Sequence, residues 1–190
     1  PVYEVTDATD SGLIDASGNS QTGQWGYDVT VGSLALSASY NPKPAEAHTA
    51  ESGYAVIYSG LMDGLELSGA IFDDGDTAEN DTVGVKYTMG SVTAAYQITN
   101  VDYEATGSTD QDASHYGVSI AVNENLSVSA GRQEIEFDGA ADDEVNTGLS
   151  ASYTMGSIAI GGGFNSVSSV GGSASAEDID ASIFNIAFSF

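Results

Sequence analysis

The chain has 190 residues, of which 28 are Asp or Glu and only 3 are Lys or Arg, so its formal charge is −25 with both His neutral. A surface that follows nucleic-acid phosphates, or that binds anionic headgroups through a polybasic patch, needs clustered cationic side chains. Lys43, Lys86 and Arg132 are too few and too scattered for either purpose. We therefore expect no nucleic-acid partner.

The residue types that are missing narrow the chemistry further. The sequence contains no Cys, which excludes disulfides, thiolate metal sites and thiol nucleophiles. Its two His, His48 and His115, lie far apart and form no paired metal-binding motif. No segment approaches the roughly 18 to 20 consecutive apolar residues of a membrane-spanning helix, so a helical membrane protein is excluded. The 23 Gly and 10 Tyr, with only 3 Pro, favour an all-β chain.

The dominant pattern along the chain is alternation with a period of two, which predicts β-strands with one apolar and one small, polar face. In one segment, Val83, Val85 and Tyr87 alternate with Gly84 and Lys86. The pattern predicts eleven strands, at residues 25–31, 34–40, 53–59, 65–72, 81–89, 92–102, 114–122, 126–137, 145–155, 158–167 and 179–190.

The links between these segments alternate between short and long. Short links such as Gly90-Ser91 and Gly156-Ser157 contain the residues of tight hairpin turns, whereas long links such as 104–112 are polar. In an up-and-down meander this alternation collects the short turns at one end and the long loops at the other. The string Tyr-Thr-Met-Gly-Ser occurs at 87–91 and again at 153–157, which indicates a reiterated hairpin unit.

The composition of the two faces indicates which solvent each one meets. A soluble β-sandwich carries Lys, Glu and Arg on its outer face. Here the second face is built from Gly, Ser, Ala, Thr and Asn, and the charges gather in the long links. Lipid on one side and water on the other explain this pattern, so the sequence predicts an antiparallel up-and-down transmembrane β-barrel. The alternative is an acidic soluble or surface-exposed β-protein, such as an adhesin or a calcium-stabilised sandwich, whose apolar faces meet each other.

At this point the sequence resembles the general porins of the Gram-negative outer membrane, most closely the alphaproteobacterial type. The run from Ser182 to Phe190 is similar to the family's C-terminal strand, which assigns an assembly signal to Phe184, Phe188 and Phe190. The Tyr-Thr-Met-Gly-Ser strings resemble the family's periplasmic hairpins. Such porins have sixteen strands, so the resemblance implies that the chain is the C-terminal two-thirds of a 16-stranded barrel and part of a longer protein.

The first segment resembles the loop that folds inward and narrows the pore of these porins. The strings Val2-Tyr3-Glu4-Val5-Thr6-Asp7 and Gly12-Leu13-Ile14-Asp15 carry this likeness, so we expect residues 1–24 to be a constriction loop and 25–190 the barrel wall. The resemblance implies that the narrow zone is lined by Glu4, Asp7, Asp10 and Asp15. A ring of carboxylates favours cations. The alternative is that these acids belong to a solvated surface loop.

The resemblance also implies basic residues on the lumen wall opposite the acidic loop. Lys86 alternates with apolar neighbours and is the best candidate, the alternative being a charge near a strand end that reaches for headgroups. Arg132 has the same parity as Leu126 and Val128. It turns toward the pore only if a β-bulge near Gly131 shifts the register.

Two further sites have weaker sequence support. Asp73, Asp74 and Asp76 place several oxygen atoms within four residues, as a Ca²⁺ ion requires, but without EF-hand spacing; the alternative is a solvated, self-repelling loop. His115 lies on the polar side near several Ser, which is the only indication of a hydrolase with a Ser-His-Asp site. Since no GxSxG string surrounds any Ser, we expect no enzymatic activity.

Together these features predict a channel for passive diffusion in the outer membrane of a Gram-negative bacterium. The expected cargo is small hydrophilic solutes and ions, with a preference for cations. The expected partners are outer-membrane lipid and lipopolysaccharide and, from the resemblance alone, two further copies in a homotrimer. We expect no cofactor other than the Ca²⁺ ion considered above.

Overall fold

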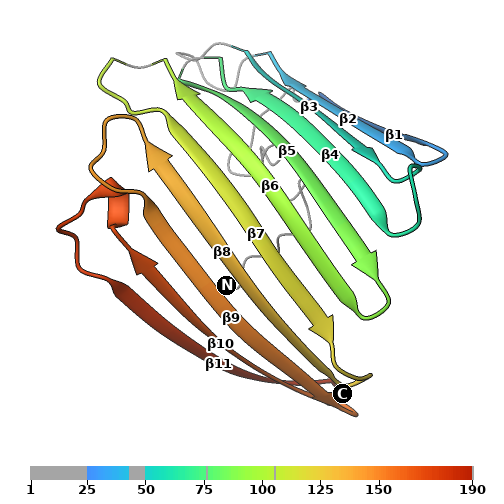
Figure 1. The fold of residues 1–190 in the computed structure, drawn as a ribbon. Coiled ribbons are helices and arrows are strands. Elements are labelled where there is room, and N and C mark those ends of the chain that lie inside the picture. Colours follow the sequence, from blue (N-terminus) through green and yellow to red (C-terminus); the bar gives the residue numbers. More distant parts are fainter. Residues whose placement is uncertain (1–24, 43–49, 76, 105, 190) are drawn as a thin grey trace. The chain divides into compact units, whose positions relative to one another are not determined.

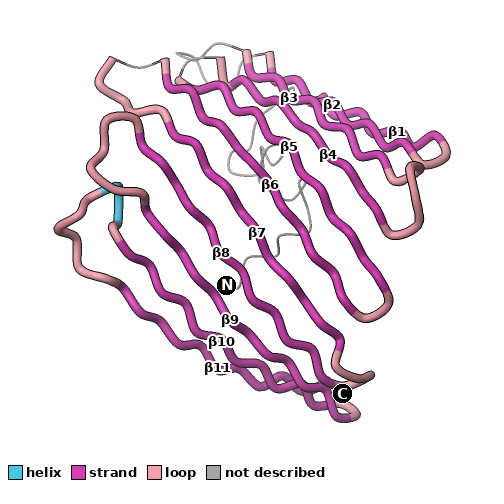
Figure 2. Tube along the Cα trace, in the orientation of Figure 1, coloured by secondary structure: helices cyan, strands magenta, loops and turns pink. Residues whose placement is uncertain are grey.

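Strands make up almost all of the regular structure in the computed structural model, which describes residues 25–42, 50–75, 77–104 and 106–189 (Figure 2). They are β1 Trp25–Val31, β2 Leu34–Asn41, β3 Glu51–Tyr58, β4 Leu65–Asp73, β5 Ala78–Met89, β6 Val92–Tyr103, β7 Gln111–Ala121, β8 Leu126–Phe137, β9 Glu144–Met155, β10 Ile158–Ser168 and β11 Ile179–Phe188. A single turn of 3₁₀-helix, η1 Val170–Gly172, precedes β11. Within the described ranges, no helix has the length and apolar character needed to cross a membrane.

The eleven strands form one sheet in which each strand pairs with its neighbour in the chain (Figure 1). Pairing is antiparallel and continuous between β1 and β4 and between β8 and β11, for example from Trp25 opposite Tyr40 to Val31 opposite Leu34. This topology is the predicted meander, and the predicted number of strands is confirmed.

The chain divides into two compact units. The N-terminal unit contains the described parts of 25–86 and 97–112, and the C-terminal unit contains 87–96 and the described parts of 113–190. The boundary between them falls within β5, β6 and the start of β7.

The shortest hairpin turns follow from glycine. Gly32, Gly90 and Gly156 have φ values of 62°, 62° and 60°, and each begins a two-residue link to the next strand. Ser169 is the only described non-glycine residue with a positive φ, so the Ser that follows each of these Gly has a negative one. Glycine with positive φ at the first central position is typical of a type II′ turn, whose twist matches that of the flanking strands.

Some strands begin earlier than the alternation of apolar residues predicts. β5 starts at Ala78 rather than at 81, because Asp74 organises the preceding turn. Its Oδ1 accepts hydrogen bonds from the backbone N–H of Thr77 at 2.7 Å and of Ala78 at 2.9 Å. Backbone pairing thus continues through polar residues, for which the alternation of apolar residues predicts no strand.

The exposure of the two faces is the reverse of that in a soluble protein. On β5, Val83 and Met89 are 56% and 67% exposed, whereas Thr82 is 1% exposed. The buried apolar cluster is small and consists of Ala55 and Ala70, with Phe72 packed against it. A water-soluble fold would bury its large apolar side chains, so these strands must meet an apolar surrounding on their exposed face.

Replacing Gly90 with Val tests the turn geometry. Left-handed backbone costs a residue with a Cβ roughly 1–2 kcal/mol, so Gly90→Val should lower the free energy of unfolding by about that amount. Denaturant unfolding of the full-length protein in detergent micelles measures the change. The control is Ser91→Ala in the same turn, which should unfold like the wild type. Equal stability of Gly90→Val and wild type would contradict the turn assignment.

Candidate functional site

The face that carries the small and polar side chains is the candidate functional site, and we call it the polar face. In register across three strands, Ser37 pairs with Ala55 and Ala55 with Ala70, while the next residue of each strand belongs to the opposite, apolar face. Strand register alone therefore brings these residues together on the polar face.

Polar side chains on this face of the N-terminal unit hydrogen bond to one another between strands. The hydroxyls of Thr82 and Thr99 lie 2.9 Å apart, and Gln97 Nε2 donates to Thr99 Oγ1 at 3.2 Å. Near the long-loop end of β2, Asn41 Nδ2 donates to Glu51 Oε2 at 3.3 Å. These contacts satisfy polar groups that are partly or fully buried, as folded proteins require.

Lys86 lies on the polar face and forms an ion pair with Glu66 of the adjacent strand. The Lys86 Nζ to Glu66 Oε1 distance is 2.7 Å, and the two side chains are 28% and 30% exposed. The alternation that placed Lys86 on the polar side is therefore reproduced in the structure, but its carboxylate partner on the same wall was not foreseen. A partly exposed pair such as this contributes little to stability and mainly localises charge.

The C-terminal unit has a similar network on its polar face. The hydroxyls of Ser129 and Ser150, which are opposite each other in register, lie 2.7 Å apart. Asn146 Nδ2 donates to Gln133 Oε1 at 3.3 Å and to Glu144 Oε1 at 3.0 Å. Glu144 Oε2 also accepts the backbone N–H of Gly171 at 2.9 Å, which ties the 3₁₀ turn to the polar face.

Two glycines of the C-terminal unit make room for asparagine side chains. A Cβ on Gly148 would lie 2.8 Å from Asn165 Oδ1, and a Cβ on Gly161 would overlap Asn185 Oδ1. Gly148 pairs with Asn165, and Gly161 with Asn185, so each amide lies over its cross-strand partner. The glycines thus let polar amides lie flat along the polar face.

The β-bulge near Gly131 that would turn Arg132 toward the pore does not occur. β8 pairs with β9 in unbroken register from Leu126 opposite Tyr153 to Ile135 opposite Glu144. Arg132 therefore shares the apolar face with Val128, and it does not turn to the polar side. Its Nε donates to Glu134 Oε1 at 2.8 Å, so the guanidinium is paired on its own strand.

Several predicted site residues lie outside the described residues. These are the constriction-loop acids Glu4, Asp7, Asp10 and Asp15, together with Asp76 and Phe190. The other two aromatic residues of the expected assembly signal, Phe184 and Phe188, lie on the apolar face of β11 and are 72% and 60% exposed. The roles assigned to all these residues stay predictions.

The acidic turn considered for Ca²⁺ uses its carboxylates internally. Asp73 Oδ1 accepts the backbone N–H of Gly75 at 2.6 Å, and Asp74 accepts the backbone N–H and hydroxyl of Thr77. Among the described residues, no group of three or more His, Cys, Asp and Glu could hold a metal ion. His115 is on the polar face of β7 and half buried.

The charge of the polar face is the feature that residue-by-residue reasoning missed. Its described strands carry four acidic residues, Asp28, Glu51, Glu66 and Glu144, and one basic residue, Lys86. Each occupies an alternating position that small polar residues also occupy in its own strand. The alternation in the sequence therefore already predicts that these charges lie on the polar face. The result is a polar face with an excess of carboxylates.

Comparison with known proteins agrees with this architecture. A family described as Gram-negative porin matches residues 2–190. No curated protein matches the chain.

Solved structures of similar fold include porins and an outer-membrane protein. A refined porin structure matches with a TM-score of 0.67 and 18% identity, over 87% of this chain and 60% of that one. OmpT of Vibrio cholerae, as a loop-deletion mutant, matches with a TM-score of 0.69 and 15% identity, over 87% and 62%. A variant of the Rh. blastica porin matches with a TM-score of 0.64 and 20% identity, over 88% and 55%. The chain thus spans a little over half the length of these proteins.

Single cysteines test the assignment of the two faces in a chain that has none of its own. Ser119→Cys on the polar face should react with a membrane-impermeant sulfonated thiol reagent, and its neighbour Ile120→Cys should react only with a lipid-soluble maleimide. Labelling of the full-length protein in lipid vesicles, read by mass spectrometry, measures both reactions.

Quenching by nitroxides tests the position of Arg132. A fluorophore attached to Arg132→Cys should be quenched by a lipid that carries a nitroxide at the headgroup, because Arg132 belongs to the apolar face. A fluorophore on Ser119→Cys should be quenched only by a water-soluble nitroxide, and the same response from Arg132→Cys would contradict the assignment of Arg132 to the apolar face.

Proposed function

The chain belongs to the Gram-negative porin family of the outer membrane, and from that premise we propose that the full-length protein forms a water-filled channel for passive diffusion of small hydrophilic solutes and ions. The observation that carries the proposal is the polar face, whose hydrogen-bonded hydroxyls, amides and carboxylates lie opposite an exposed apolar face. Such a pair of faces fits water on one side and hydrocarbon on the other.

Passive diffusion requires no covalent step from the protein. The polar side chains offer weak, replaceable hydrogen bonds along a wall, so a hydrated solute can exchange partners as it moves. The small size of Ser, Thr, Gly and Ala on this face leaves room for water and solute. We propose no catalytic role for His115.

We further propose that the channel prefers cations. Four carboxylates and one ammonium on the polar face of the described strands give an excess negative charge. Carboxylates that line a pore attract cations and repel anions. The acids Glu4, Asp7, Asp10 and Asp15 add to this charge if residues 1–24 fold inward as the resemblance implies.

The remaining expectations follow from the family and stay proposals. They are an alphaproteobacterial type of porin, a homotrimer, contact with lipopolysaccharide, and an assembly signal in the aromatic residues of the last strand. The exposed Phe184 and Phe188 on β11 support the last of these, because an edge strand with a regular aromatic face offers a repeating recognition pattern.

Ion selectivity tests the charge of the polar face. In planar bilayers with a KCl gradient, the full-length protein should show a reversal potential that favours K⁺ over Cl⁻. Glu66→Gln should reduce the K⁺ preference and Lys86→Gln should increase it. Each change should be within about fivefold in permeability ratio, since a unit charge about 4 Å away in water contributes on the order of 1 kcal/mol.

Glu134→Gln is the matched control, because it removes a carboxylate from the apolar face of β8 and should leave the reversal potential unchanged. Anion preference of the wild type would overturn the proposed selectivity. Absence of any conductance from correctly inserted protein would overturn the channel itself.

A further inference from the structure

A groove lies on the polar face of the C-terminal unit, over β9, β10 and β11. Its volume is about 300 Å³, at the lower end of the range of small-molecule sites, so it fits one small solute. Two rows in register form its centre, Ser150 with Gly163 and Ile183, and Ser152 with Gly161 and Asn185. The groove thus has hydroxyls along β9, a floor of glycine in β10, and one aliphatic and one amide side chain on β11.

Glycine at position 161 is required by the amide that lies above it. A Cβ on Gly161 would overlap Asn185 Oδ1, so a side chain at this position would displace the amide. The Asn185 amide therefore extends from β11 over the backbone of β10. By contrast, a Cβ on Gly162, which belongs to the apolar face, would lie 3.5 Å from the carbonyl oxygen of Ile183, an ordinary contact distance. Glycine thus has a specific role at the floor of the groove.

The amides of Asn165 and Asn185, which both line the groove, are not part of the hydrogen-bonded networks of the polar face. In those networks Asn146 donates to Gln133, and Asn41 donates to Glu51. Among the described residues, no backbone or side-chain group hydrogen bonds to the amide of Asn165 or Asn185. Each amide therefore has an acceptor oxygen and two donor hydrogens available to a solute.

An exposed aliphatic side chain lies next to the Asn185 amide. Ile183 is opposite Gly163 on the polar face and is 48% exposed. Apolar surface in contact with water is unfavourable, so covering Ile183 contributes to the binding of a solute that has an apolar side of its own. The groove therefore matches a molecule with hydrogen-bonding groups along one edge and C–H groups on a face.

The lining of the groove is uncharged. None of the described residues that line it is ionisable, whereas Glu66 and Lys86 form an ion pair on the polar face of the N-terminal unit. A charged solute would lose hydration in the groove and gain no opposite charge, which is unfavourable. A neutral solute with hydroxyl groups exchanges hydrogen bonds with water for hydrogen bonds with the amides.

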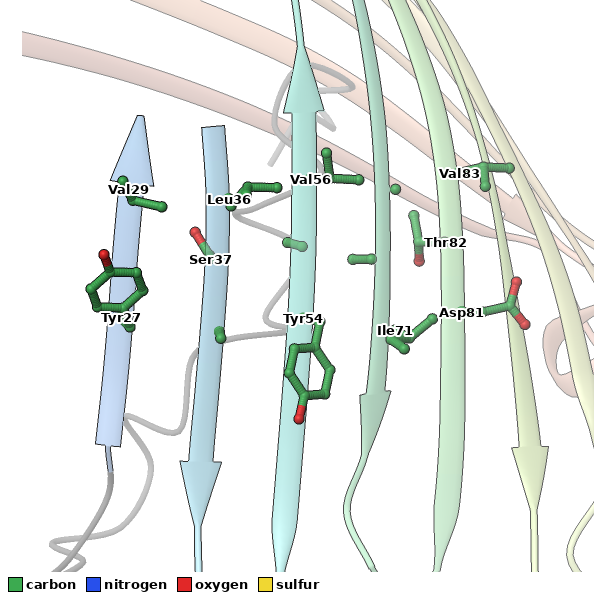
Figure 3. A pocket seen from close by; sticks show the side chains of 14 residues that line it. Tyr27, Val29, Leu36, Ser37, Tyr54, Val56, Ile71, Asp81, Thr82 and Val83 are labelled. Atoms are coloured by element: carbon green, nitrogen blue, oxygen red, sulfur yellow. The ribbon is translucent and has the colours of Figure 1, made fainter. Parts of the chain in front are cut away.

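A larger furrow on the opposite face does not offer the same site. It has a volume of about 650 Å³ and crosses the apolar face of the N-terminal unit beside Leu36, Val56 and Ile71 (Figure 3). That face is expected to meet hydrocarbon, so a solute dissolved in water does not reach it. Of these two hollows, only the groove on the polar face is accessible from a water-filled channel.

We propose that this groove is a low-affinity subsite for a neutral monosaccharide, whose hydroxyls bind Asn185 and Ser152 and whose C–H face covers Ile183. Adjacent sugar hydroxyls both donate and accept, as the amide does. The proposal rests on the channel proposed above and deepens it by naming a class of solute. A sugar held at this position during its passage makes transport saturable.

Block of the ion current by sugar tests the subsite. The full-length protein is studied in planar bilayers at constant KCl, and conductance is measured as glucose is added. Glucose in the groove excludes ions from part of the lumen, so the conductance, corrected for that of the bulk solution, should fall along a saturating curve. A poly(ethylene glycol) of the same hydrodynamic size has no hydroxyl donors along its chain, and its effect should not saturate.

Two substitutions test the role of the amide. Asn185→Leu keeps the approximate size of the side chain but removes the amide, and should raise the half-blocking glucose concentration about two- to tenfold, the range that one hydrogen bond between neutral groups supplies. Gly161→Ala should have a similar effect, because its Cβ displaces the Asn185 amide. Gly162→Ala is the matched control, since it adds the same methyl group to the opposite face and should respond to glucose like the wild type.

A second pair of variants tests the apolar contact. Ile183→Ser should also raise the half-blocking glucose concentration. Ile179→Ser removes an aliphatic side chain from the same face of β11 but outside the groove, and should leave that concentration unchanged. Ion current in the absence of sugar shows that each variant is folded and inserted.

The outcomes separate the subsite from the channel. Absence of ion current from inserted wild type would overturn the channel. Normal ion current with no saturable block by glucose would overturn the subsite alone. An unchanged half-blocking concentration in Asn185→Leu and Gly161→Ala would show that glucose binds elsewhere in the lumen, which also contradicts the proposal.

Discussion

The structure depends on one constraint, which is that backbone N–H and C=O groups surrounded by hydrocarbon must find their partners within the protein. An antiparallel meander satisfies this requirement strand by strand, because every strand interior to the sheet pairs on both sides. Once the backbone groups are hydrogen-bonded in this way, the two faces of each strand can carry different kinds of side chain. Large apolar groups such as Met89 are exposed on one face, while groups such as Thr82 are buried on the other.

Alternation of residue types was sufficient to predict most of the fold, since a period of two is a direct consequence of the pleat. It identified the strands, the short glycine turns and the side of the sheet on which Lys86 lies. It could not place the strand starts at Ala78 and Gln111, because there the pairing is maintained by backbone and by carboxylates such as Asp74, which carry no hydrophobic signal. The choice between a membrane protein and a soluble sandwich came from the composition of the faces, and the family match agrees with the former.

The site was less accessible to sequence reasoning. A pore-facing Arg132 required a β-bulge near Gly131, and the register of β8 and β9 excludes that bulge. A strand can instead carry an ion pair on its apolar face where the face leaves the hydrocarbon, as Arg132 and Glu134 do. Cross-strand partners such as Glu66 for Lys86 depend on the offset between two strands, which a single sequence does not specify. The acids of the polar face stand at the same alternating positions as the small polar residues, but their combined charge becomes apparent only when the strands are placed side by side.

The register of the C-terminal unit also determines how thick a bilayer these strands can accept. One row across four strands is wholly polar, and it consists of Arg132, Thr147, Ser166 and Asp180. From that row toward the short turns, the apolar span of β9 extends only from Leu149 to Met155. This is about 20 Å along the strand at its usual rise per residue. Hydrophobic mismatch would penalise a thicker membrane by drawing the polar row into the acyl layer. The bacterial outer membrane is thinner than average, so a short apolar span of this kind suits that compartment better than a thicker bilayer.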